Sequence, residues 1–132
     1  MQELREGVFT DEHFRETMIG RESEELRQLA KIFNGFANST RLSILLLLSR
    51  RGEMRVGELV DELRAPQPRI SDHLRCLSWC GYVKVRRTGR NAYYSLADER
   101  VLEMLRLGKA LLRDNRERVV FGQASRADYQ EG

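Results

Sequence analysis

Hydrophobic residues first recur at the spacing of an α-helix between Ser23 and Phe36. Ser23 is a good cap for the start of this helix. A second helix is expected to begin near Ser39 or Thr40, both good caps, and to end at Gly52. It contains the apolar run "ILLLL", so we expect it to be buried on most sides.

Two shorter helices are predicted on either side of a proline pair. The stretch "VGELVDEL", residues 56–63, has an amphipathic pattern. Pro66 and Pro68 end this helix and open the next, because proline fits the first turn of a helix. The next helix is expected from Gln67 to Cys80. Two short helices joined by a tight turn, the second one basic, are typical of a helix-turn-helix.

Alternating apolar positions in "YVKVRRTGRNAYYSL" predict a β-hairpin that turns at Thr88 and Gly89. Its tip is basic through Arg86, Arg87 and Arg90. A final helix is expected over residues 98–113. The chain is therefore expected to be mainly α with a small β-hairpin, in the order of a winged helix-turn-helix.

The patterned region divides the chain into three parts. Residues 1–22 are expected to form an N-terminal arm, residues 23–113 the winged-helix domain, and residues 114–132 a flexible C-terminal tail. The length of 132 residues fits one domain.

Charge is distributed unevenly along the chain. The net charge is only +3, but the segment 64–90 carries one acid, Asp72, among its basic residues Arg64, Arg69, Arg75, Lys84, Arg86, Arg87 and Arg90. A basic block within a nearly neutral chain is typical of a surface that binds a polyanion.

Several functional classes are disfavoured by the sequence. The longest apolar run, Ile44 to Leu48, is five residues and is too short to cross a bilayer. With no apolar signal region at the N-terminus, a cytoplasmic location is expected. Catalysis is not expected, because Ser71 and His73 would point apart on a helix and no glycine-rich phosphate loop is present.

Candidate base-reading residues lie at the start of the second helix-turn-helix helix, away from its apolar stripe: Gln67, Arg69, Ser71 and Arg75. Arg69 suits a bidentate guanine contact and Gln67 an adenine contact. Asp72 would repel phosphate, so it either orients an arginine or stays clear of DNA.

Further candidates would hold the DNA backbone. His73 could reach a phosphate or a base. Arg87 and Arg90 would approach the backbone or the minor groove from the hairpin. Thr40 and Arg41, at a helix start, would clasp a phosphate.

The two cysteines of the chain, Cys76 and Cys80, lie four residues apart in the same helix. At 100° per residue they share one stripe with Arg69 and His73. Thiolates select soft metals, and two sulfurs alone suit linear ions such as Hg(II) or Cu(I). A third ligand could come from His73, or from side chains near the two termini: His13, Asp11 and Asp128.

Two other readings of the cysteine pair remain open. The thiols could form a redox switch, through a disulfide or a sulfenic acid. Alternatively, they could be small buried hydrophobic side chains with no sensing role.

The segments "STRLSIL", "QPRISDHLRCL" and "GRNAYYSL" resemble the ArsR/SmtB family of winged-helix metal-sensing repressors, over about residues 26–112. The resemblance implies a homodimer held by the first and last helices of the domain. It also implies binding to double-stranded operator DNA of twofold symmetry, with release when an inducer binds.

Within that family, "HLRCLSWCGYV" is most similar to the CmtR-type cadmium and lead sensors, which carry two cysteines at this spacing. That branch implies a third cysteine in the C-terminal tail, which this chain lacks. We therefore expect a soft inducer bound at Cys76 and Cys80, with Hg(II) or an organomercurial favoured and Cd(II) or Pb(II) next. A thiol-redox repressor without a metal is the alternative.

Overall fold

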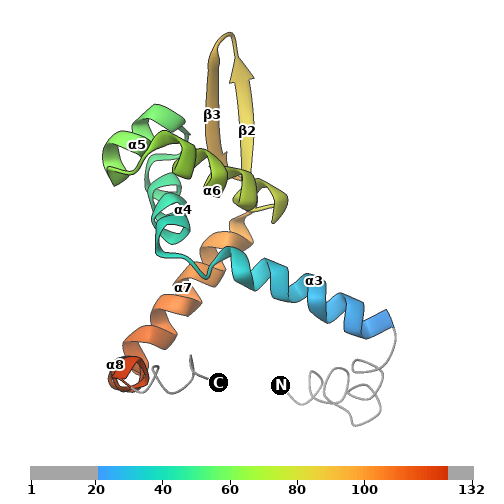
Figure 1. Cartoon of the computed structure of the whole chain (residues 1–132), viewed down its shortest axis with the longest axis vertical. Helices are drawn as coiled ribbons and strands as arrows, with labels where there is room; N and C mark the ends of the chain where they lie inside the picture. Colours follow the sequence, from blue (N-terminus) through green and yellow to red (C-terminus); the bar gives the residue numbers. More distant parts are fainter. Residues whose placement is uncertain (1–20, 125–132) are drawn as a thin grey trace.

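The computed structural model describes residues 21–124, and the fold is a winged helix-turn-helix (Figure 1). Its elements in chain order are α3 (Arg21–Gly35), α4 (Ser39–Arg51), β1 (Met54–Arg55), α5 (Val56–Leu63), α6 (Gln67–Trp79), β2 (Val83–Thr88), β3 (Asn91–Leu96), α7 (Glu99–Asp114) and α8 (Arg116–Ala124). The fold class predicted from the sequence is thus confirmed. Residues 1–20 of the predicted N-terminal arm, with Asp11 and His13, and the end of the tail, with Asp128, lie outside the described residues.

Local signals place the helix boundaries within one or two residues of the prediction. Helix α4 begins at Ser39 as expected, but its cap is Asn38, whose side chain accepts a hydrogen bond from the Arg41 amide at 3.0 Å. The expected caps Ser39 and Thr40 lie one and two residues too late. Gly52 ends α4 at φ +85°, a conformation that favours glycine.

The hairpin belongs to a three-stranded antiparallel sheet of order β1-β3-β2. Thr88 pairs with Asn91, so the turn residues are Gly89 and Arg90, and the predicted turn at Thr88–Gly89 was displaced by one residue. Gly89 has φ +58°, as a tight hairpin turn requires. The short strand β1 pairs Met54 with Tyr94 and was not predicted.

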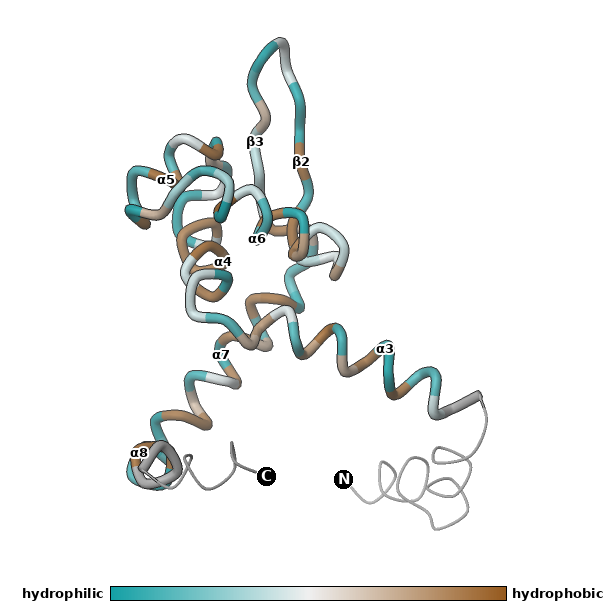
Figure 2. The backbone as a smooth tube through the Cα atoms, viewed as in Figure 1, coloured by the Kyte–Doolittle hydropathy of each residue, from teal (hydrophilic) through white to brown (hydrophobic). Residues whose placement is uncertain are grey.

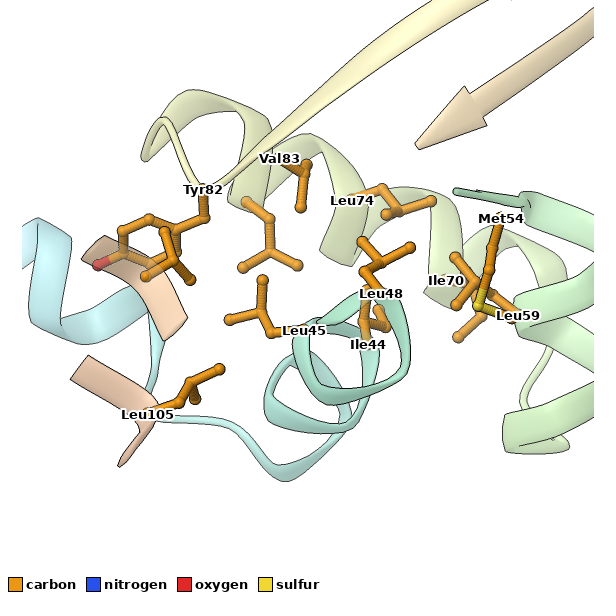
Figure 3. Packing of buried hydrophobic residues seen from close by; sticks show 12 residues of the cluster. Ile44, Leu45, Leu48, Met54, Leu59, Ile70, Leu74, Tyr82, Val83 and Leu105 are labelled. Carbon is orange, nitrogen blue, oxygen red and sulfur yellow. The ribbon is translucent and has the colours of Figure 1, made fainter. Parts of the chain in front are cut away.

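The hydrophobic core joins α4 to the helix-turn-helix and to the base of the hairpin. Figure 3 shows Ile44, Leu45 and Leu48 of α4 packed toward Ile70 and Leu74 of α6. All five are at most 1% exposed. This core fixes which side of α6 is buried and leaves the opposite side free to carry function.

Two helices project from the body on the side away from the hairpin (Figure 1). Both α3 and α7 carry brown, hydrophobic positions along their length (Figure 2). Exposed apolar side chains on them include Leu29, Phe33, Leu107 and Leu111. A groove of about 660 Å³ lies between α3, α4 and α7. These apolar faces are not covered within residues 21–124.

The chain continues as a helix where the sequence predicts a flexible tail. Arg116–Ala124 forms α8 directly after Asn115, which ends α7. None of the helices in residues 21–124 is long and apolar enough to span a membrane.

Candidate nucleic-acid interface and thiol pair

The outer side of α6 presents the predicted base-reading residues. Gln67, Arg69 and Arg75 are exposed, and Ser71 is half-buried. The core residues Ile70, Leu74 and Leu77 hold the other side of the helix in place. Pro68 in the first turn leaves the helix start regular, because proline suits that position.

Asp72 forms an ion pair with Arg75 one turn further along α6. Oδ1 of Asp72 accepts a hydrogen bond from Nη1 of Arg75 at 3.2 Å, and both side chains are exposed. The acid therefore orients an arginine, which is one of the two roles expected for it. An exposed pair of this kind adds at most about 1 kcal/mol of stability.

The hairpin arginines have different environments. Arg86 is bound to both carboxylate oxygens of Glu53, at 3.1 and 3.2 Å, and lies 4.6 Å from the centre of the Tyr93 ring. Arg87 and Arg90 are exposed toward the tip. Arg86 thus braces the hairpin, while Arg87 and Arg90 are available to approach a polyanion.

Arg41, which was predicted to clasp a phosphate, makes hydrogen bonds within the protein. Its guanidinium donates to the carbonyl oxygens of Gly35 and Asn34, each at 2.9 Å, and it lies 3.4 Å from Nδ1 of His73. The carbonyls at the end of α3 need donors because they have no partner within the helix. These contacts tie Arg41 to the end of α3, and its contact with a phosphate stays a prediction.

Thr40 and His73 border a hollow of about 580 Å³ beside the start of α6. Asn38, Arg69 and Asp72 also line it. Partial burial, followed by the charges of Arg41 and Arg69, lowers the pKa of His73 below its ordinary value of 6.5. His73 is therefore neutral at pH 7.

The two thiols lie together on the side of α6 that faces α3. Both cysteines are free and half-buried. Sγ of Cys80 donates to the carbonyl oxygen of Lys31 in α3 at 3.8 Å. Burial and the neighbouring Cys76 thiol raise the pKa of Cys80, so it is protonated at pH 7.

The thiol pair supplies two ligands within the described part of the chain. No group of three or more His, Cys, Asp or Glu side chains able to hold a metal occurs in residues 21–124. His73, one of the possible third ligands, lies with its Nδ1 3.4 Å from Nη1 of Arg41. Two sulfurs alone remain suited to a soft ion with linear coordination.

Residues 38–85 match the model of the family described as bacterial regulatory protein, arsR family. An uncharacterized HTH-type transcriptional regulator of Methanocaldococcus jannaschii is 44% identical over 84 residues, which cover 64% of this chain and 94% of that protein. The chain belongs to the arsR family of bacterial regulatory proteins.

Other relatives of this arsR-family chain include a probable mercury resistance operon repressor of Streptomyces lividans, 42% identical over 65% of this chain and 68% of that protein. Among solved structures, the homodimeric winged helix-turn-helix domain of a possible ArsR-family regulator of Mycobacterium bovis is 31% identical, with a TM-score of 0.65. That match covers 74% of this chain and 88% of the other. Family and relatives are DNA-binding regulators, which confirms that the chain is not an enzyme.

Sequence reasoning missed Tyr82 and Gly35 in this arsR-family protein. The Tyr82 hydroxyl donates to the Ile32 carbonyl oxygen of α3, and its ring lies 4.5 Å from that of Phe36. Burial, then the two thiols, raises the pKa of Tyr82 to about 12, so the phenol is a neutral donor at pH 7. The pattern of α3 gives no sign of these contacts, because they depend on how α3 meets α6.

Proposed function

We propose that this arsR-family chain is a repressor that binds operator DNA as a homodimer and releases it when a soft thiophilic ion binds Cys76 and Cys80. Hg(II) or an organomercurial is the favoured inducer, and Cd(II) or Pb(II) comes next. The observation that carries the proposal is that Cys76 lies in α6 and Cys80 caps its C-terminal end, so both thiols belong to the helix that presents Arg69 to solvent.

Several features support DNA contact by the outer side of α6 and the tip of the hairpin. The residues that would contact base edges are Gln67, Arg69, Ser71 and Arg75. Arg87, Arg90 and Thr40 would hold phosphates, and His73 borders the same hollow as Arg69. Arg41 is better described as a positioning residue that fixes α3 next to this face.

The homodimer is supported by the uncovered apolar faces of α3 and α7. Apolar area of this extent on a soluble protein marks an interaction surface, and the solved Mycobacterium bovis relative is homodimeric. A symmetric dimer would present two copies of α6 to an operator of twofold symmetry. Such a repressor would act in the cytoplasm.

The choice of metal rests on the number and chemistry of the ligands. Two thiolates and no third ligand among residues 21–124 favour an ion with linear coordination. The Streptomyces lividans relative is named for mercury resistance, which agrees with this preference. The two-cysteine resemblance to CmtR-type sensors supports the same pair of ligands and keeps Cd(II) and Pb(II) as second candidates.

The test is a titration of the protein–operator complex with Hg(II), Cd(II), Pb(II) and Zn(II) under reducing conditions. We expect Hg(II) to lower operator affinity by about 5- to 150-fold, the range typical of coupled sites. Cys76→Ser with Cys80→Ser should bind operator normally and should not respond. If no ion releases DNA from the wild-type protein, metal sensing is excluded. Release by peroxide alone would instead favour the redox alternative.

A further inference from the structure

The direction of α3 depends on its C-terminal turn. In Figure 1 the helix projects away from the body and approaches it only where it leads into α4. Leu26, Leu29 and Phe33 along its length are exposed. Bonds made by the last turn therefore determine where α3, and the apolar face that it carries, lies relative to α6.

Two neighbouring carbonyls in that turn accept hydrogen bonds from the end of α6 and the residues after it. The Cys80 thiol donates to the carbonyl of Lys31 at 3.8 Å, and the Tyr82 hydroxyl donates to the carbonyl of Ile32. We call these two bonds the α3 clasp. Arg41 holds the next carbonyls, those of Asn34 and Gly35, from α4.

The clasp is closely packed as well as hydrogen-bonded. A Cβ atom added to Gly35 would lie 2.7 Å from Cε2 of Tyr82 and 3.1 Å from Sγ of Cys80. Distances this short require a shift of the surrounding atoms. Tyr82 is itself 4% exposed. The thiol of Cys80 consequently cannot turn or gain a bulky ligand without disturbing the contact with α3.

We propose that the α3 clasp is the coupling element of the sensor: Tyr82 holds α3 in the DNA-binding position, and ligation of Cys80 opens the other half of the clasp. This inference rests on the proposed function. When the ion binds, Cys76 and Cys80 each form a sulfur–metal bond and each lose one proton to solvent. Cys80 then has no hydrogen to donate to Lys31, and sulfur and carbonyl lone pairs face each other.

The consequence is a competition between the ion and Tyr82. Opening the clasp frees α3 to move, and α3 carries part of the face that pairs two protomers. Movement there changes the distance between the two copies of α6 and so weakens their simultaneous contact with the operator. The Tyr82–Ile32 bond opposes this movement, so part of the binding energy of the ion is used to break it.

The test compares Tyr82→Phe with wild type. The phenyl ring keeps the packing on Gly35 and Phe36 but lacks the hydroxyl. We expect Tyr82→Phe to release operator at a free Hg(II) concentration about two- to tenfold lower, the factor that one hydrogen bond represents. Free Hg(II) is set with a monothiol buffer. Quenching of Trp79, the single tryptophan of the chain, reports Hg(II) binding to the free protein.

The matched control is Tyr94→Phe, which removes a hydroxyl from a half-buried tyrosine of β3 that pairs with Met54. It should titrate like wild type. Equal Hg(II) midpoints for Tyr82→Phe and Tyr94→Phe, or weaker Hg(II) binding by Tyr82→Phe, would overturn the clasp. Failure of the proposed function is a separate result, in which wild-type protein keeps its operator at every buffered Hg(II) concentration.

Discussion

Arg41 and Arg69 show how the same residue type takes two roles. Both are basic and near a helix start, and both were predicted to contact DNA. Arg41 is turned toward the end of α3, where two carbonyl oxygens accept hydrogen bonds from its guanidinium. Arg69 remains exposed beside the hollow at the start of α6. The difference follows from the position of α3, which supplies acceptors to one arginine and not to the other.

Arg69→Ala should lower operator affinity by about 1–3 kcal/mol and flatten the preference at one base position, because a bidentate arginine discriminates bases. Gel-shift titrations on the operator and on single-base variants would measure both effects. Arg113→Ala is the control, since Arg113 is exposed in the last turn of α7, at the end far from the hairpin (Figure 1). Unchanged operator affinity for Arg69→Ala would remove Arg69 from the interface.

At the scale of elements, the contact of α3, α4 and α6 contains a titratable group. His73 on α6 faces Arg41 from α4, with Arg69 and Asp72 on its own helix. Burial and the two arginines disfavour its charged form, while Asp72 favours it. Protonation of His73 would place a third positive charge in this junction.

The stability of the protein should therefore decrease as the pH falls below about 6.5. The pKa of His73 is lowered in the folded state, so the unfolded chain takes up the proton first and gains free energy from it. Thermal midpoints at pH 8 and pH 5 would show the decrease. His73→Gln cannot take up this proton and should lose less stability between the two values. An identical loss in both proteins would show that His73 does not contribute.

The elements predicted correctly are those with local signals. The boundaries of helices α3 to α7 were predicted to within one or two residues. The signals were the apolar periodicity, Pro66 and Pro68, and the glycines that follow α4 and α6. Strand β1 has two residues and so shows no period, and its pairing with Tyr94 is a long-range contact. The stretch 116–124 was assigned to a tail because its polar composition hides the helix α8.

From the sequence, the candidate site could be predicted only for residues that lie in the same helix. Helical geometry alone indicates that Cys76 and Cys80 share a side of α6. The residues opposite them could not be predicted, because Lys31 lies 49 positions before Cys80 in the sequence. The α3 clasp is formed by this tertiary contact, and a single sequence carries no periodic signal for it.

At the scale of the whole molecule, the described residues form a body of α4, α5, α6 and the sheet, from which α3 and α7 project (Figure 1). The core of α4, α5, α6 and the sheet is closed, whereas Leu107 and Leu111 on α7 are 67% and 65% exposed. Leaving such side chains in water is unfavourable by about 25 cal/mol for each Å² of apolar surface. A second copy of the chain offers the same apolar surfaces, so pairing covers both molecules at once.

Leu107→Glu with Leu111→Glu should therefore yield a folded monomer. Both side chains line the groove between α3, α4 and α7 and lie outside the buried core, so sedimentation should show half the wild-type mass with little change in circular dichroism. Operator affinity should fall by about 10²-fold or more, because one reading helix then binds without its tethered partner. Arg106→Glu places a carboxylate on the neighbouring position of α7, which does not line the groove, and should remain dimeric. A dimeric double variant would mean that other surfaces pair the protomers, and movement of α3 would then no longer change the spacing of the two reading helices.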